Sequence, residues 1–179
     1  MHLILANNSA AGGAGAGAYE AIASASPTSG TSVSFTSIPS SYKHLQIRAH
    51  WKTASSGADL IMRFNNDTAS NYAYHYIRGD SAGTVSMGAG PNESSITVQD
   101  SDGDYFVASI IDIHDYADTN KYKTSRIFAG RNNNGTSTTR VQLRSGLWMS
   151  TSAIDRIDLS FGGTTFSNGS TIALYGIKG

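Results

Sequence analysis

The stretch HLQIRAHWK, residues 44–52, has the clearest strand pattern in the chain. Every second side chain in it is apolar, and these side chains are Leu45, Ile47, Ala49 and Trp51. A period of two places them on one face of an extended segment and the polar residues on the other. This pattern predicts a strand of an antiparallel sheet with one buried face and one solvated face.

The same alternation recurs along the chain, in short segments separated by turn residues. The further segments are SVSFTSI (32–38), DLIMRFNN (59–66), YAYHYIRGD (72–80), SSITVQD (94–100), YFVASIIDIHDY (105–116), YKTSRIFAGR (122–131), TRVQLRSGLWM (139–149), IDRIDLSF (154–161) and TIALYGI (171–177). Turns such as NNNG (132–135) and SNG (167–169) supply Asn and Gly for positive φ. About nine or ten antiparallel strands with one apolar face each predict a two-sheet β-sandwich of jelly-roll type.

Three of these segments give finer expectations. SSITVQD is short, which is typical of an edge strand. YFVASIIDIHDY breaks its alternation at Ile110–Ile111, which predicts a β-bulge. TIALYGI is apolar on both faces, and we therefore expect a final strand that is buried within a sheet rather than frayed.

The bulk composition limits the class of protein. The chain has 179 residues, 39% hydrophobic and only 15% charged, with 19 glycines and no cysteine. One domain of this size buries roughly 70% of the surface that its unfolded chain exposes. The 13 basic and 13 acidic residues give a net charge of zero, so we expect neither nucleic acid nor a membrane as partner.

The first 18 residues differ from the rest of the chain. Residues 7–18 are mostly Gly and Ala, which predicts a flexible N-terminal arm over residues 1–18 and a single domain over residues 19–179. An alternative is that the arm packs on a neighbouring subunit through the apolar residues of HLIL (2–5). Four apolar residues are too few for a signal-peptide core or a membrane span, so we expect a protein made in the cytoplasm without a leader.

The sequence contains no motif that pairs a nucleophile with a base, and none that forms a phosphate-binding loop. G-x-S-x-G, the P-loop and H-E-x-x-H are all absent, and GGAGAGA (12–18) precedes no βαβ pattern. We therefore expect no enzyme, no catalytic residue and no cofactor.

One loop carries spaced carboxylates. Asp100, Asp102 and Asp104 match the first, third and fifth positions of an EF-hand, but the twelfth position is Ile111 instead of Glu. The residues after Asp104 also have a strand pattern. An EF-hand is therefore excluded, and the alternatives are a looser calcium loop or a polar turn.

The tyrosines of YAYHYIRGD form the main binding hypothesis. Tyr72, Tyr74 and Tyr76 alternate along one face and Arg78 follows them, so the row could stack on sugars or contact another subunit. This hypothesis requires Ala73 and Ile77 to form the buried face of the strand; in the opposite arrangement the tyrosines are buried. The Arg78-Gly79-Asp80 triplet fits a strand end followed by a turn, and it needs no adhesion receptor to explain it.

Several of these segments together resemble β-sandwich structural proteins of tailed bacteriophages, especially marine and freshwater phages and cyanophages. The resemblance rests on IPSSYKHLQIRAHWKT (38–53), DLIMRFNNDTASNYAYHYIRGD (59–80) and GSTIALYGIKG (169–179), with IIDIHDYADTNKYKTSR (110–126) and SGLWMSTSAIDRIDL (145–159) between them. It covers the chain from about residue 19 to residue 179.

This resemblance implies a non-enzymatic virion protein. A compact domain behind a short arm fits a capsid decoration or cement protein, which stabilises the head by contacts with the major capsid protein and is commonly a homotrimer. The alternative that the resemblance implies is a carbohydrate-binding module of a tail or head fibre, with a host surface glycan as partner. The expected location is the virion, after synthesis in the host cytoplasm.

Overall fold

The computed structural model describes residues 17–103, 105–131 and 139–179, with only the backbone at Asp102. Gly17 and Ala18 are the only residues of the expected arm in this part, and the amide of Lys178 donates to the Ala18 oxygen at 3.0 Å. The described residues form twelve strands: β1 (Tyr19–Ala25), β2 (Ser32–Phe35), β3 (His44–Trp51), β4 (Ser56–Phe64), β5 (Tyr72–Asp80), β6 (Val85–Glu93), β7 (Ile96–Asp102), β8 (Val107–His114), β9 (Lys123–Arg131), β10 (Arg140–Trp148), β11 (Ile157–Phe161) and β12 (Thr171–Ile177).

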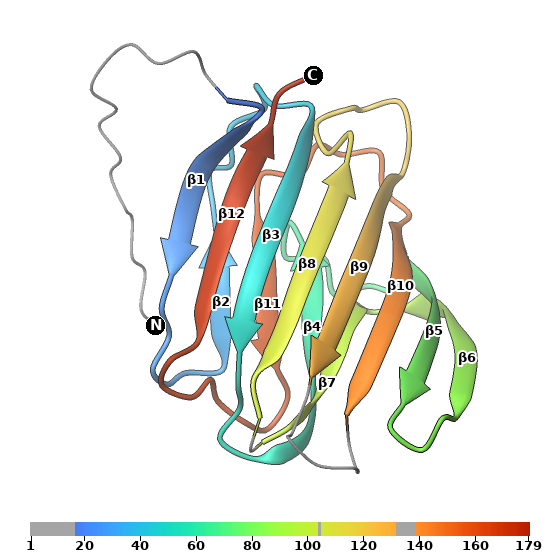
Figure 1. Cartoon of the computed structure of the whole chain (residues 1–179). Helices are drawn as coiled ribbons and strands as arrows, with labels where there is room; N and C mark the ends of the chain where they lie inside the picture. The colour runs from blue at the N-terminus through green and yellow to red at the C-terminus, as the bar shows by residue number, and fades with distance from the viewer. Residues whose placement is uncertain (1–16, 104, 132–138) are drawn as a thin grey trace.

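The strands form two antiparallel sheets packed as a sandwich, as the sequence predicts. The larger sheet has the order β1-β12-β3-β8-β9-β10-β5-β6, and the smaller one has the order β2-β11-β4-β7. Figure 1 shows the eight-stranded sheet in front of the four-stranded one.

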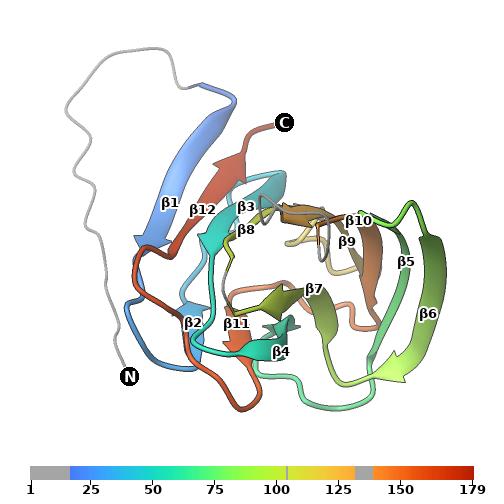
Figure 2. The ribbon, with the colours of Figure 1, turned by 60° about the horizontal axis from the view of Figure 1, so that its bottom comes forward.

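The topology is that of a jelly roll with two added hairpins. The strands β1, β2, β3 and β4 pair in turn with β12, β11, β8 and β7, while the chain alternates between the two sheets. The hairpins β5–β6 and β9–β10 both join the larger sheet. They make it twice as wide as its partner, and Figure 2 shows it curving around the smaller sheet.

The predicted alternation produces the core. The odd-numbered apolar residues of β3 are buried, and Trp51 has no exposed surface. Leu60, Met62 and Phe64 of β4 pack from the other sheet, as expected. SSITVQD becomes β7, which is an edge strand of the smaller sheet as predicted.

The expected bulge at Ile110–Ile111 is wrong. β8 alternates regularly between buried and exposed residues, and its pairing with β3 and β9 has no register shift. Ile111 lies in the core, whereas Ile110 is 42% exposed on the outer face. The break in the pattern is thus an apolar side chain on the solvent face, and not a change in the backbone.

The last strand, β12, lies between β1 and β3 and is not frayed, as expected. Its inner face is buried, and its outer face with Ala173, Tyr175 and Ile177 is half-buried. Leu174 is fully buried on the inner face. Gly176 is buried where the ring of Tyr42 crosses the strand, and a Cβ at this position would overlap that ring. The close approach of Tyr42 therefore requires a glycine here.

Replacing Gly176 by Ala should destabilise the domain by about 1–3 kcal/mol, because the methyl group displaces the Tyr42 ring. Gly162→Ala is the matched control, since nothing lies within 4 Å of its added Cβ, and it should change stability by less than about 0.5 kcal/mol. Urea unfolding followed by tryptophan fluorescence measures both. Equal stability of the two variants would contradict the packing of Tyr42 on β12.

Candidate functional site

The tyrosine row of β5 faces the inside of the sandwich rather than solvent. Tyr72 is fully buried beside Phe64 and Trp148, and its hydroxyl accepts a hydrogen bond from the Phe64 amide at 3.0 Å. Burial raises the pKa of Tyr72 to about 12. Tyr72 therefore offers no ring face to a sugar, and the prediction of an open platform of three tyrosines is wrong at this residue.

Tyr74 and Tyr76 are half-buried and already stacked. The Arg144 guanidinium lies 4.4 Å from the centre of the Tyr74 ring and 4.9 Å from that of Tyr76. The same rings pack so closely on Gly88 and Gly90 of β6 that neither glycine has room for a Cβ. These two tyrosines hold the outlying hairpin to the rest of the sheet.

Arg78 belongs to the same inner layer. Its Nε donates to the Ser86 hydroxyl at 2.8 Å, and its guanidinium lies 5.6 Å from the centre of the Tyr76 ring. The structure thus brings Tyr74, Tyr76 and Arg78 together, as the sequence suggested. Their side chains make packing contacts and a hydrogen bond between β5 and β6.

The Asp100 carboxylate forms ion pairs with two arginines. Arg131 Nη1 lies 3.3 Å from Asp100 Oδ2 and 2.8 Å from the Asp100 backbone oxygen, and Arg140 Nη1 also pairs with Oδ2. Burial alone would raise the pKa of Asp100, but the hydrogen bond from Arg140 and the two positive charges outweigh it and lower that pKa. Asp100 therefore joins β7 to β9 and β10.

The calcium loop gains no support from this arrangement. Among the residues that the structure describes, no three carboxylates or histidines are grouped to hold a metal ion. The backbone of Asp102 pairs with Ser56 at the end of β7, and Asp104 lies outside the described residues.

An unexpected feature is a row of exposed apolar side chains across the outer face of the larger sheet. Strand register places Ile110 of β8 opposite Phe128 of β9, Phe128 opposite Leu143 of β10, Leu143 opposite Ile77 of β5, and Ile77 opposite Met87 of β6. All five are exposed, from 42% at Ile110 to 77% at Met87. We call this row the apolar ladder: Ile77, Met87, Ile110, Phe128 and Leu143.

The surface around the ladder carries no charge on three neighbouring strands. The outward residues of β10, β5 and β6 are Val141, Leu143, Ser145, Leu147, Ala73, His75, Ile77, Gly79, Val85, Met87 and Ala89. None of them is Asp, Glu, Lys or Arg. Val85 and Val141 are themselves more than 45% exposed and extend the apolar surface beside the ladder.

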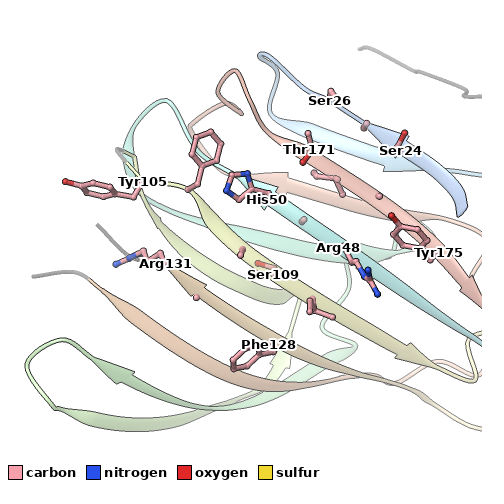
Figure 3. A pocket seen from close by; sticks show the side chains of 18 of the residues that line it. Ser24, Ser26, Arg48, His50, Tyr105, Ser109, Phe128, Arg131, Thr171 and Tyr175 are labelled. Atoms are coloured by element: carbon pink, nitrogen blue, oxygen red, sulfur yellow. The ribbon is translucent and has the colours of Figure 1, made fainter. Parts of the chain in front are cut away.

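A groove lies next to the ladder on the same face, over β1, β12, β3, β8 and β9 (Figure 3). Its volume is about 1230 Å³. We call it the outer groove, and its main lining side chains are Arg48, His50, Phe106, Phe128, Thr171 and Tyr175. Ile110 and Phe128 belong to both features, so the groove and the ladder form one continuous surface.

Parts of this surface left a signal in the sequence. Ile110 gives a break in alternation, and Phe128 lies on the polar face of β9 with Thr124 and Arg126. In β10 the face with Val141 and Leu143 is the apolar one by sequence, yet the structure exposes it and buries Gln142 and Arg144. What the sequence did not contain was the strand order that aligns them. Recognition of the ladder needs the pairing β10·β5, which joins segments far apart in the chain.

Comparison with protein-family models, with curated proteins and with solved structures finds no match to this chain. None of the described residues forms a helix long and apolar enough to cross a membrane. The functional argument therefore rests on the geometry of the outer face.

Replacing Asp100 by Asn should destabilise the domain by about 1–3 kcal/mol at neutral pH, because Arg131 and Arg140 lose their shared carboxylate. The pKa of Asp100 is lowered, so this contribution is present above the unfolded-state pKa and is lost as the pH falls through the lower folded-state value. The difference between the variant and the unmodified protein should therefore shrink in acid. Urea unfolding at several pH values measures it.

Asp155→Asn is the matched control for this experiment, because Asp155 is exposed. It should leave stability nearly unchanged at every pH. Calcium chloride should not raise the unfolding temperature of the unmodified protein or of the Asp100→Asn variant. A calcium-dependent rise that Asp100→Asn abolishes would contradict the structural role and restore the calcium loop.

Proposed function

We propose that this protein is a non-enzymatic structural module that works through a protein contact made by the apolar ladder. The ladder carries this proposal. Isolated apolar residues are normal on a surface, but a contiguous row across five strands marks an interaction site. With Val85 and Val141 it gives seven neighbouring apolar side chains that are each 42–77% exposed, unlike the singly scattered apolar residues of an ordinary surface.

The composition of this surface favours contact between copies of the same chain. Interfaces between identical subunits are the more apolar ones, and charged residues are depleted at their centre. The outer face of β10, β5 and β6 has no charged side chain. The assembly that we propose is the homotrimer that the phage resemblance implies, with the apolar ladder at the contacts between its subunits. Flanking polar surface would supply the rest of the about 800 Å² per partner that a stable interface needs.

The biological setting that we propose is the head of a tailed bacteriophage. The segments that resemble phage β-sandwich proteins include β3, β4, β5 and β12, which form much of the core and the wide sheet. A net-neutral jelly roll that assembles through one apolar face fits a decoration or cement protein. It would stabilise the shell by binding major capsid subunits only in their assembled arrangement.

The alternative is a fibre module that binds sugars on the tyrosine row, and the structure does not offer these tyrosines as an open platform. Tyr72 is buried, and Tyr74 and Tyr76 stack with Arg144. We therefore do not propose glycan binding at these tyrosines.

The setting is tested on purified phage particles whose genome encodes this sequence. Mass spectrometry should find the protein in the particle, and cryo-electron microscopy should place its density on the head, at symmetry axes of the shell. Absence from the particle would overturn the virion proposal, and density at the tail tip would overturn the decoration proposal.

The ladder is tested by Leu143→Lys, which places a charge at the middle of the row. Since Leu143 is 52% exposed, the monomer should keep its stability within about 0.5 kcal/mol. Sedimentation velocity should show a trimer for the unmodified protein and a monomer for the variant. Tyr122→Lys, at a 51% exposed residue outside the ladder, is the control and should stay trimeric. A monomeric unmodified protein, or a trimeric Leu143→Lys variant, would contradict the proposal.

A further inference from the structure

The outer groove differs from the ladder in charge. Among the lining residues that the structure describes there are three arginines and no Asp or Glu: Arg48, Arg131 and Arg140. Arg131 and Arg140 both pair with Asp100 at one end of the groove. Arg48 is the remaining arginine of the described lining, and its charge favours an anionic ligand.

Arg48 is the arginine placed for such a ligand. It lies in the middle of the groove on β3, where its Nε donates to Gln46 Oε1 at 2.8 Å. Its guanidinium carbon is 5.5 Å from the centre of the Tyr19 ring and 5.4 Å from that of Tyr175. These rings carry no charge, and no direct ion pair joins Arg48 to a carboxylate in the described part of the chain. Its partner Gln46 in turn donates through Nε2 to Asp112 Oδ1 at 2.7 Å. An arginine that is oriented by its neighbours and has no direct ion pair suits a carboxylate or a sulfate group.

The rest of the lining is aromatic and rich in hydroxyl groups. The His50 and Phe106 rings stack at 4.3 Å with 11° between their planes, and Phe128 is 55% exposed at the opposite side of the groove (Figure 3). Ser24, Ser26 and Thr171 line the remaining wall and are exposed. Aromatic rings pack against the apolar faces of sugar rings, and hydroxyl side chains both donate to and accept from sugar hydroxyls.

An extended peptide fits this groove less well than a saccharide does. The groove crosses the strands instead of following an edge, and the backbones of β12, β3 and β8 are already paired on both sides. A peptide therefore cannot add as a strand over these elements, which is how main-chain hydrogen bonds give peptides their affinity for sheets. A volume of about 1230 Å³ also exceeds the roughly 300–1,000 Å³ of ordinary small-molecule pockets and fits several linked units.

We propose that the outer groove binds an acidic oligosaccharide, with Arg48 pairing with its carboxylate or sulfate groups and the aromatic side chains contacting its rings. This site adjoins the contact proposed for the ladder and shares Ile110 and Phe128 with it, but the two can be tested separately. Leu143, which tests the ladder, does not line the groove, and Arg48 is not part of the ladder.

Calorimetric titration of the full chain tests the proposal with four probes: hexagalacturonate, sulfated maltohexaose, neutral maltohexaose and a hexaglutamate peptide. At least one acidic saccharide should bind, and the neutral one should bind at least about tenfold more weakly. Preference for hexagalacturonate would assign the carboxylate, and preference for sulfated maltohexaose would assign the sulfate; either result supports the proposal. Failure of both acidic saccharides to bind, or equally tight binding of hexaglutamate, would overturn it.

Arg48→Gln should weaken acidic-saccharide binding about tenfold, and Arg48→Lys should restore part of it. Arg126→Gln is the matched control: Arg126 is exposed on the same face of the sheet and does not line the groove, so binding should be unchanged. Equal losses in the Arg48→Gln and Arg126→Gln variants would overturn the assignment to the groove. Leu143→Lys should bind as the unmodified protein does, which separates this site from the ladder.

Discussion

The larger sheet is twice as wide as the sheet that covers it, and this mismatch determines the rest of the structure. Four strands cannot cover the inner face of eight, and β7, the edge of the smaller sheet, reaches only as far as β10 and β5. Beyond that line an inner face of ordinary apolar residues would be open to water. The inner face of the hairpin β5–β6 therefore needs side chains that tolerate partial exposure to water, because the smaller sheet covers them only in part.

Arginine and tyrosine meet this need. Arg144 is 6% exposed and lies over the rings of Tyr74 and Tyr76, so its long side chain fills space while its charge interacts with the rings. Beside this layer Asp100 of β7 pairs with Arg131 and Arg140, and Asp59 of β4 lies opposite Asp100 in the strand register. Burial and the charge of Asp100 raise the pKa of Asp59, whereas the arginines lower the pKa of Asp100. At β10, β5 and β6 the inner layer of the sandwich thus consists of charged groups and aromatic rings, whereas the rest of the interior is an apolar core.

Local pattern was enough to predict the core but not the surfaces. In HLQIRAHWK the alternation alone separates Trp51 from Arg48, because burial of one face requires a period of two. The tyrosines of β5 alternate equally well, yet their surroundings depend on β6 and on Arg144, which the alternation does not contain. β6 itself was missed, since Gly88, Gly90 and Pro91 interrupt its strand pattern. Likewise, the pattern around the exposed Ile110 predicts a bulge, because its partners across the sheet are known only once the strand order is known.

The net charge of zero conceals a division within one face of the sheet. Over β10, β5 and β6 the outer surface is apolar and uncharged, whereas over β3 and β12 it carries Arg48 and hydroxyl groups. Burying the surface over β10, β5 and β6 against a neighbouring subunit costs little free energy, because no charge must be desolvated. The surface over β3 and β12 would be costlier to bury in the same way, since the charge of Arg48 would have to be desolvated and its link to Asp112 runs only through Gln46. A single rigid sheet can therefore hold a permanent contact on one half while the other half stays open to a charged, exchangeable ligand.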